Sequence, residues 1–241
     1  MVGPVDDVTP KVAFTETQLR GFYDHLHVHV TFANARDWFM YVLSFYALLR
    51  VSEVHRLTWG DLTCTDTYIG VNVPYSKTSL TPVIIKLSIR HDWACPKRAL
   101  DSYLQARNKY LSNTNITHGR QHPVFLTHPK VMTSAVTIEQ SQLLLKTLIT
   151  RTFPASTSAL SASAYAWHSF RRGGTTAMIN AGVPMAVVQA HGRWRSDCYL
   201  RYYDAIHVHT LLPTQMLQLN ATTTAVAASL HTTATASHKH A

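Results

Sequence analysis

One stretch, residues 168–203, constrains the chain more than any other and reads HSFRRGGTTAMINAGVPMAVVQAHGRWRSDCYLRYY. It opens with an imidazole and a guanidinium three residues apart and closes on two adjacent tyrosines. Positions i and i+3 share one face of a helix, so His168 and Arg171 are predicted to point into one pocket. Arg binds phosphate through two parallel hydrogen bonds, His donates or accepts a proton, and Tyr is a competent covalent nucleophile. The stretch therefore predicts a site where a tyrosine attacks a phosphate.

The same stretch predicts its own helix boundaries. Gly173 and Gly174 are expected to loosen the chain after the His–Arg pair, which leaves a short helix over residues 175–180. Pro184 suits the first turn of a second helix, which should stop near the next glycine. A final helix is expected over residues 196–203, with Ser or Asp as its cap.

Net charge and cysteine content narrow the class of partner and the compartment. The 241 residues carry 22 Lys and Arg against 13 Asp and Glu, for a net charge of +9. A basic balance favours a polyanionic partner, nucleic acid first and anionic membrane second.

Cys64, Cys95 and Cys198 form no paired pattern, so we interpret them as reduced packing residues of an intracellular, reducing compartment. No apolar run is long enough for a membrane span, and we find no secretory signal peptide pattern within the sequence.

Hydrophobic periodicity predicts a mainly helical α+β fold with a small antiparallel sheet. Alternating Val and Ile over residues 68–90 predict two or three short strands. Helical spacing predicts four helices before the 168–203 stretch, over residues 15–27, 34–49, 95–111 and 138–151.

A second motif surrounds Arg50, at the exit of the strongly apolar helix. The string is apolar-R-x-S-E-x-x-x-L-x-W-x-D-apolar, in which Glu53, Trp59 and Asp61 follow the arginine at fixed distances. A lone arginine in such a position is usually a surface residue at the start of an amphipathic helix. The nine matched positions favour a functional Arg50 instead.

Together the two motifs resemble the catalytic domain of the tyrosine recombinases, which include the phage integrases. The string GRWRSDCYLRYY is most similar to the branch found in crypton and DIRS-like mobile elements. The resemblance implies a lead-in over residues 1–13, a catalytic domain over 14–210, and a C-terminal helix remnant with a low-complexity tail over 211–241.

The resemblance also implies the chemistry: DNA cleavage and rejoining through a 3′-phosphotyrosine, with no cofactor and no metal. Arg50 and Arg171 would clamp the scissile phosphate, and His168 would bind the phosphate or move the tyrosine proton. Lys77, in the YSKT turn, would protonate the leaving 5′ oxygen. Arg193 and Trp194 follow the last glycine of the stretch, where the family has a His or Trp that binds phosphate.

The register of the nucleophile depends on which residue occupies that His/Trp position. Arg193 in this position makes Tyr202 the nucleophile, whereas Trp194 makes it Tyr203. Neighbouring residues on a helix point about 100° apart, so only one phenol faces the phosphate. We prefer Tyr202, with Tyr203 as the alternative.

The front of the chain departs from the family, because a helical core-binding domain usually precedes the catalytic one. We therefore expect a truncated or degenerate copy, or one that needs a separate partner. Double-stranded DNA is the expected substrate, bound by a homo-oligomer, a tetramer on DNA. The expected compartment is the nucleus in a eukaryote and otherwise the cytoplasm. Two other functions remain open: relaxation of the type IB topoisomerase kind, and an inactive DNA-binding remnant of a mobile element.

Overall fold

The computed structural model describes residues 11–74, 82–111, 119–154 and 161–202. These residues belong to one unit of the chain, Met1–Tyr203. Lys77, Tyr203 and the predicted segment 211–241 lie outside the described residues.

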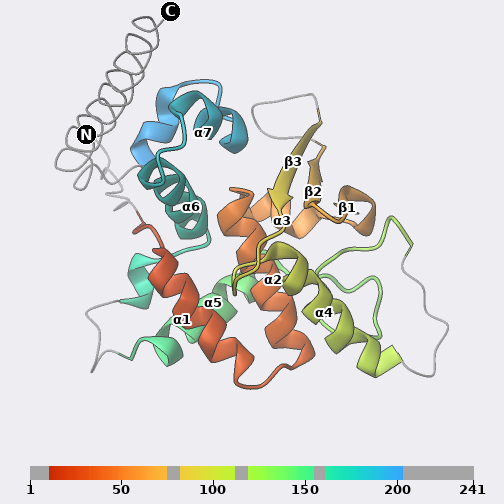
Figure 1. Cartoon of the computed structure of the whole chain (residues 1–241). Helices are drawn as coiled ribbons and strands as arrows, with labels where there is room; N and C mark the ends of the chain where they lie inside the picture. The colour runs from red at the N-terminus through yellow and green to blue at the C-terminus, as the bar shows by residue number, and fades with distance from the viewer. Residues whose placement is uncertain (1–10, 75–81, 112–118, 155–160, 203–241) are drawn as a thin grey trace, which may run out of the picture. The chain divides into compact units, whose positions relative to one another are not determined.

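The described chain is mainly helical with one small sheet, which confirms the predicted fold class (Figure 1). The α-helices are α1 (Glu16–His27), α2 (Phe32–Tyr46), α3 (Val51–Arg56), α4 (Pro96–Leu111), α5 (Ile138–Thr152), α6 (His168–Asn180) and α7 (Met185–Gly192). Short 3-10 helices are η1 (Trp59–Asp61), η2 (Ala162–Ala164) and η3 (Asp197–Tyr202). The predicted last helix is thus present as a 3-10 helix.

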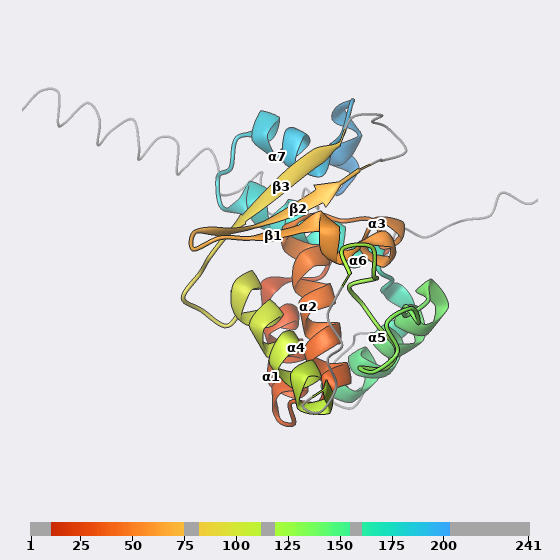
Figure 2. The same cartoon turned by 90° about the vertical axis from the view of Figure 1, so that its right-hand side faces the viewer.

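Helix α2 is the centre of the fold. Every residue from Ala35 to Phe45 is buried, as its apolar sequence predicts. It packs against α1, α4 and α6, and α3 follows directly after its end. Both views place α3, α6, α7 and the sheet around one end of α2, and α1, α4 and α5 along the rest (Figures 1 and 2).

The sheet is antiparallel with strand order β1 (Leu62–Cys64), β2 (Tyr68–Val73) and β3 (Val83–Ser88). Its first strand precedes the predicted strand region. Strands β2 and β3 pair as far as Val73 opposite Val83, so the connection that contains Lys77 leaves from their paired ends.

The glycine pair of the key stretch does not loosen the chain, and this prediction was wrong. Helix α6 runs unbroken through Gly173 and Gly174. A Cβ at Gly173 would lie 2.0 Å from the carbonyl oxygen of Phe14, and one at Gly174 would lie 2.0 Å from that of Phe45. Close packing of α6 on two remote backbone segments, rather than flexibility, explains both glycines.

A small second core holds the C-terminal part of the described chain. Its buried members are Leu48, Ile179, Val188, Trp194 and Tyr199. These side chains join the end of α2 to α6, α7 and η3. The same residues therefore fix the segment that carries Arg193 and leads to Tyr202.

The sequence also predicted buried cysteines and no membrane-spanning helix. Cys95 is buried, as a packing residue should be, but Cys64 is exposed on β1. Among the described residues, no helix has the length and apolarity that crossing a bilayer requires.

Candidate active site

Arg50 lies at the turn between α2 and α3, where it is the N-cap residue of α3. Its backbone N–H donates to Oε2 of Glu53 at 2.7 Å, and its Nη1 donates to Oε1 of the same carboxylate at 2.7 Å. The Arg50 side chain keeps 26% of its surface exposed, whereas that of Glu53 keeps 5%. Glu53 therefore holds Arg50 from behind and leaves the guanidinium open on its outer side.

Arg193 reaches the same carboxylate from the end of α7. Its backbone is left-handed, with φ 58° and ψ 40°, and its side chain is buried. Nη2 donates to Oε2 of Glu53 at 2.8 Å and to the carbonyl of Leu48 at 3.0 Å. Nη1 donates to the carbonyls of Ala47 at 3.3 Å and His191 at 3.1 Å. One guanidinium thus ties together the ends of α2 and α7 and the start of α3.

Arg171 projects from α6 into the same cluster. Its residue surface is only 1% exposed. It donates through Nη1 to the carbonyl of Leu48 and through Nη2 to that of Gly192. Its Cζ lies 4.2 Å from the centre of the Trp194 ring, within the range of a cation–π contact. Arg171 and Arg193 therefore share one acceptor, and each also donates to the carbonyl end of α7, where cations are favoured.

His168 is the first residue of α6, and its side chain is exposed. Partial desolvation and the positive charges of Arg171, Arg172 and Arg50 lower its pKa to about 4. The imidazole is therefore neutral near pH 7. The predicted shared face is present, but exposed His168 and buried Arg171 do not line it to the same depth.

The pKa of the buried Glu53 carboxylate is below its ordinary value, although burial alone would raise it. The charge of Arg193 and the hydrogen bonds from the backbone N–H and side chain of Arg50 lower the pKa by more than burial raises it. Glu53 is therefore a stable anion that holds two of the three guanidinium groups.

The fold thus brings together five of the residues predicted from the sequence: Arg50, His168, Arg171, Arg193 and Trp194. Tyr202 ends η3, but its side chain lies outside the described residues, as do Lys77 and Tyr203. Sequence reasoning missed the carbonyl of Leu48, because a backbone acceptor leaves no mark in a side-chain pattern.

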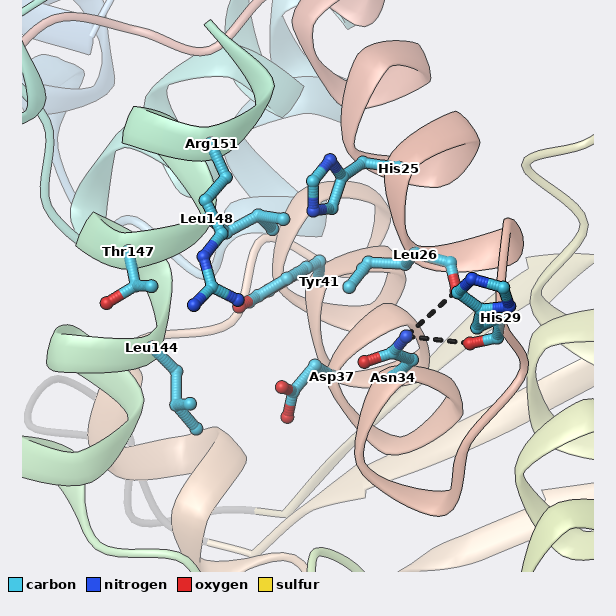
Figure 3. Close-up of a pocket in the computed structure, with 10 residues that line it drawn as sticks. All are labelled: His25, Leu26, His29, Asn34, Asp37, Tyr41, Leu144, Thr147, Leu148 and Arg151. Carbon is cyan, nitrogen blue, oxygen red and sulfur yellow. Dashed lines mark hydrogen bonds between the residues drawn. The ribbon is translucent and has the colours of Figure 1, made fainter. Parts of the chain in front are cut away.

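A separate hollow of about 210 Å³ lies between α1, α2 and α5 (Figure 3). Its lining includes His25, Asp37, Tyr41 and Arg151, and none of the residues predicted for catalysis. Burial raises the pKa of Asp37 despite its ion pair with Arg36. We therefore assign the candidate chemistry to the arginine cluster and not to this hollow.

Comparison with known proteins identifies the family. The model of the phage integrase family matches residues 13–209 of the 241. The chain therefore belongs to the phage integrase family, whose members are tyrosine recombinases. No curated protein sequence matches it.

Solved structures support the same fold at low sequence identity. The XerH site-specific recombinase in a post-cleavage complex with its difH substrate is 12% identical, with a TM-score of 0.59 over 84% of this chain and 52% of XerH. The Tn1549 transposon integrase in complex with transposon right end DNA is 20% identical, with a TM-score of 0.59 over 90% of this chain and 69% of that one. The XerA recombinase is 16% identical, with a TM-score of 0.59 over 87% and 66%. This chain spans about half the length of XerH.

Proposed function

We propose that this chain is the catalytic part of a site-specific DNA recombinase that cleaves and rejoins strands through a 3′-phosphotyrosine. One observation carries the proposal: three arginines from α3, α6 and α7 meet at Leu48 and Glu53, beside a neutral histidine. Core packing does not require three guanidinium groups in one cluster, two of them on the Glu53 carboxylate and two on the carbonyl of Leu48. A dianionic phosphorane-like transition state does, because donors placed in advance stabilise the charge that develops there.

The phosphate is expected to enter on the open side of Arg50, next to His168. Arg50 is the most exposed of the three guanidinium groups, since Arg171 and Arg193 are buried. Arg171 and Arg193 donate to carbonyls in the described structure, so they contribute positive charge from behind. Direct contact of Arg171 with a phosphate oxygen requires exchange of one of these carbonyls for that oxygen.

The transfer step needs a nucleophile, a base and an acid. The phenol oxygen attacks phosphorus, neutral His168 accepts the phenol proton, and the bond from phosphorus to the 5′ oxygen breaks. Lys77 is proposed to give its proton to the departing 5′ oxygen. The phosphodiester energy is kept in the phosphotyrosine, so a 5′ hydroxyl reverses the step and reseals a strand.

Covalent trapping on a nicked suicide duplex tests the proposal. A denaturation-resistant protein–DNA adduct is expected from the wild type and from Tyr203→Phe, but not from Tyr202→Phe. An adduct that persists in Tyr202→Phe and disappears in Tyr203→Phe would reverse the register. Gel shifts without any adduct would leave a DNA-binding remnant as the function.

A second assay separates recombination from relaxation. Two labelled duplexes that exchange strands support a recombinase, whereas a supercoiled plasmid that relaxes without exchange supports type IB topoisomerase activity.

Recombination also requires a synaptic assembly, which we propose to be a homotetramer on DNA, with a core-binding partner supplied if needed. The GRWRSDCYLRYY string favours an origin in a crypton or DIRS-like element, with activity in the nucleus of a eukaryotic host or otherwise in the cytoplasm.

A further inference from the structure

The backbone after α2 is unusual at Leu48. Helix α2 ends at Tyr46, Ala47 follows with φ −90°, and Leu48 is left-handed with φ 49°. Helices commonly end on a left-handed residue, but glycine usually occupies that position because it has no Cβ. Within the described residues, Leu48 and Arg193 are the two non-glycine residues with positive φ.

These two strained residues are in direct contact. Nη2 of Arg193 donates to the carbonyl of Leu48 at 3.0 Å, and Nη1 of Arg171 donates to the same oxygen. Backbone strain that persists in a folded protein tends to gather at functional sites. Here both strained positions lie in the arginine cluster.

The two halves of Leu48 have different partners. Its side chain is fully buried and packs with Ile179, Val188 and Trp194, so a glycine there would lose this packing. Its carbonyl serves the two guanidinium groups only while the backbone stays left-handed. Rotation of Leu48 into an ordinary conformation turns the peptide plane and removes the acceptor that Arg171 and Arg193 share.

We propose that Leu48 is a positioning residue of the active site, which sets the two buried arginines through its left-handed carbonyl. This inference rests on the proposed function, because it assigns the strain a role in DNA cleavage. The competing explanation is that Leu48 is an ordinary core residue whose backbone merely follows its packing.

The two explanations rank substitutions in opposite orders. Packing alone predicts that Leu48→Val is mildest, Leu48→Ala is worse and Leu48→Gly is worst, since the order follows the lost apolar volume. Positioning predicts the reverse for the chemical step, because a β-branched residue resists the left-handed region and glycine accepts it. The comparison of Ala with Val remains decisive even where the Gly variant does not fold.

The experiment measures single-turnover adduct formation at saturating nicked duplex, DNA affinity, and the melting temperature of each variant. We expect Leu48→Val to form adduct on the order of 10-fold to 100-fold more slowly than Leu48→Ala, as small misplacements of catalytic groups can cost up to about 10² in rate. DNA affinity should stay within about 2-fold, and the melting temperature of each variant shows whether it is folded at the temperature of the assay. A Val variant that cleaves as fast as, or faster than, the Ala variant would overturn the proposal.

A readout without catalysis separates this inference from the proposed function. Side-chain ¹H–¹⁵N signals of Arg171 and Arg193, assigned with Arg171→Lys and Arg193→Lys, should be protected from exchange in the wild type and in Leu48→Ala. Both signals should lose protection in Leu48→Val but keep it in Leu49→Val. Leu49→Val is a matched control because Leu49 follows Leu48 in the chain and is equally buried. Absence of any adduct with this pattern would refute recombination and leave positioning intact, whereas protected signals in Leu48→Val would refute positioning.

Discussion

Two buried ion pairs lie near opposite ends of α2, and they differ in how they are built. Near its start, Arg36 pairs with its sequence neighbour Asp37 at 2.7 Å. Beyond its end, Arg193 pairs at 2.8 Å with Glu53, which is 140 residues away in the sequence. Both pairs have side chains that are largely shielded from solvent.

The carboxylates of these pairs have opposite pKa shifts. Burial raises the pKa of Asp37, and its single partner Arg36 only partly opposes this. Burial also acts on Glu53, but Arg193 together with the backbone and side chain of Arg50 lowers its pKa overall. Of these two carboxylates, the one with two arginine partners has the lowered pKa and the one with a single arginine partner has the raised pKa.

The largest expected difference is in stability after neutralising each carboxylate. Glu53→Gln leaves Arg193 buried without its counter-ion and should cost about 3–5 kcal/mol of unfolding free energy. Asp37→Asn should cost less, about 1–3 kcal/mol, because burial raises the pKa of Asp37 and its carboxylate holds one guanidinium, whereas that of Glu53 holds two. Urea unfolding of both variants measures this difference. Equal losses would remove the distinction between the two pairs.

The second difference is in DNA cleavage by matched Arg→Lys variants. Arg193→Lys loses the fork that reaches four acceptors, so adduct formation should fall on the order of 10²-fold. Arg36→Lys removes an equivalent fork far from the cluster and should change the rate of the folded protein little. Single-turnover rates, corrected for the folded fraction by circular dichroism, compare the two. A loss of similar size in Arg36→Lys would show that rigidity of α2, and not the cluster, limits the reaction.

The third difference is in the pH dependence of stability. The lowered pKa of Glu53 gives stability that is present above its ordinary pKa of about 4.3 and is lost as pH falls through the folded value. The raised pKa of Asp37 gives stability that is present below about 3.9 and is lost as pH rises through the folded value. Between about pH 3 and 6, the stability of wild type minus variant should therefore rise with pH for Glu53→Gln and fall for Asp37→Asn. Urea unfolding across this range would contradict the assignment if both slopes had one sign.

The smallest expected effect is on the titration of His168. Arg50→Ala removes one of three positive charges that lower its pKa from the ordinary value to about 4, so the pKa should rise by only part of that shift. Arg36→Ala should leave the titration unchanged. Ring-proton NMR titrations compare the two variants. A return to the ordinary pKa in Arg50→Ala would mean that desolvation contributes much less than proposed.

Local sequence signals predicted much of this arrangement. The helix predicted over residues 15–27 is present as α1, and the apolar run predicted the buried α2. The string around Arg50 indicated a functional arginine. Its R-x-x-E spacing lies within the first turn of α3, where Glu53 accepts hydrogen bonds from Arg50.

The remainder depends on contacts between distant segments. Nothing near Gly173 and Gly174 reveals that the carbonyls of Phe14 and Phe45 press against them. Equally, the i, i+3 spacing of His168 and Arg171 says that they share a face but not how deep each one lies. Such properties are set only when α6 meets α2, so no local pattern encodes them.

The close packing of α6 through Gly173 and Gly174 limits which substitutions the arginine cluster tolerates. Two absent methyl groups, at Gly173 and Gly174, let α6 rest directly on backbone carbonyls of Phe14 and Phe45. That contact sets the distance between α6, which carries Arg171, and the end of α2, which leads to Arg50. A methyl group at either position would force α6 and the end of α2 apart, so neither glycine can be replaced without moving Arg171 relative to Arg50.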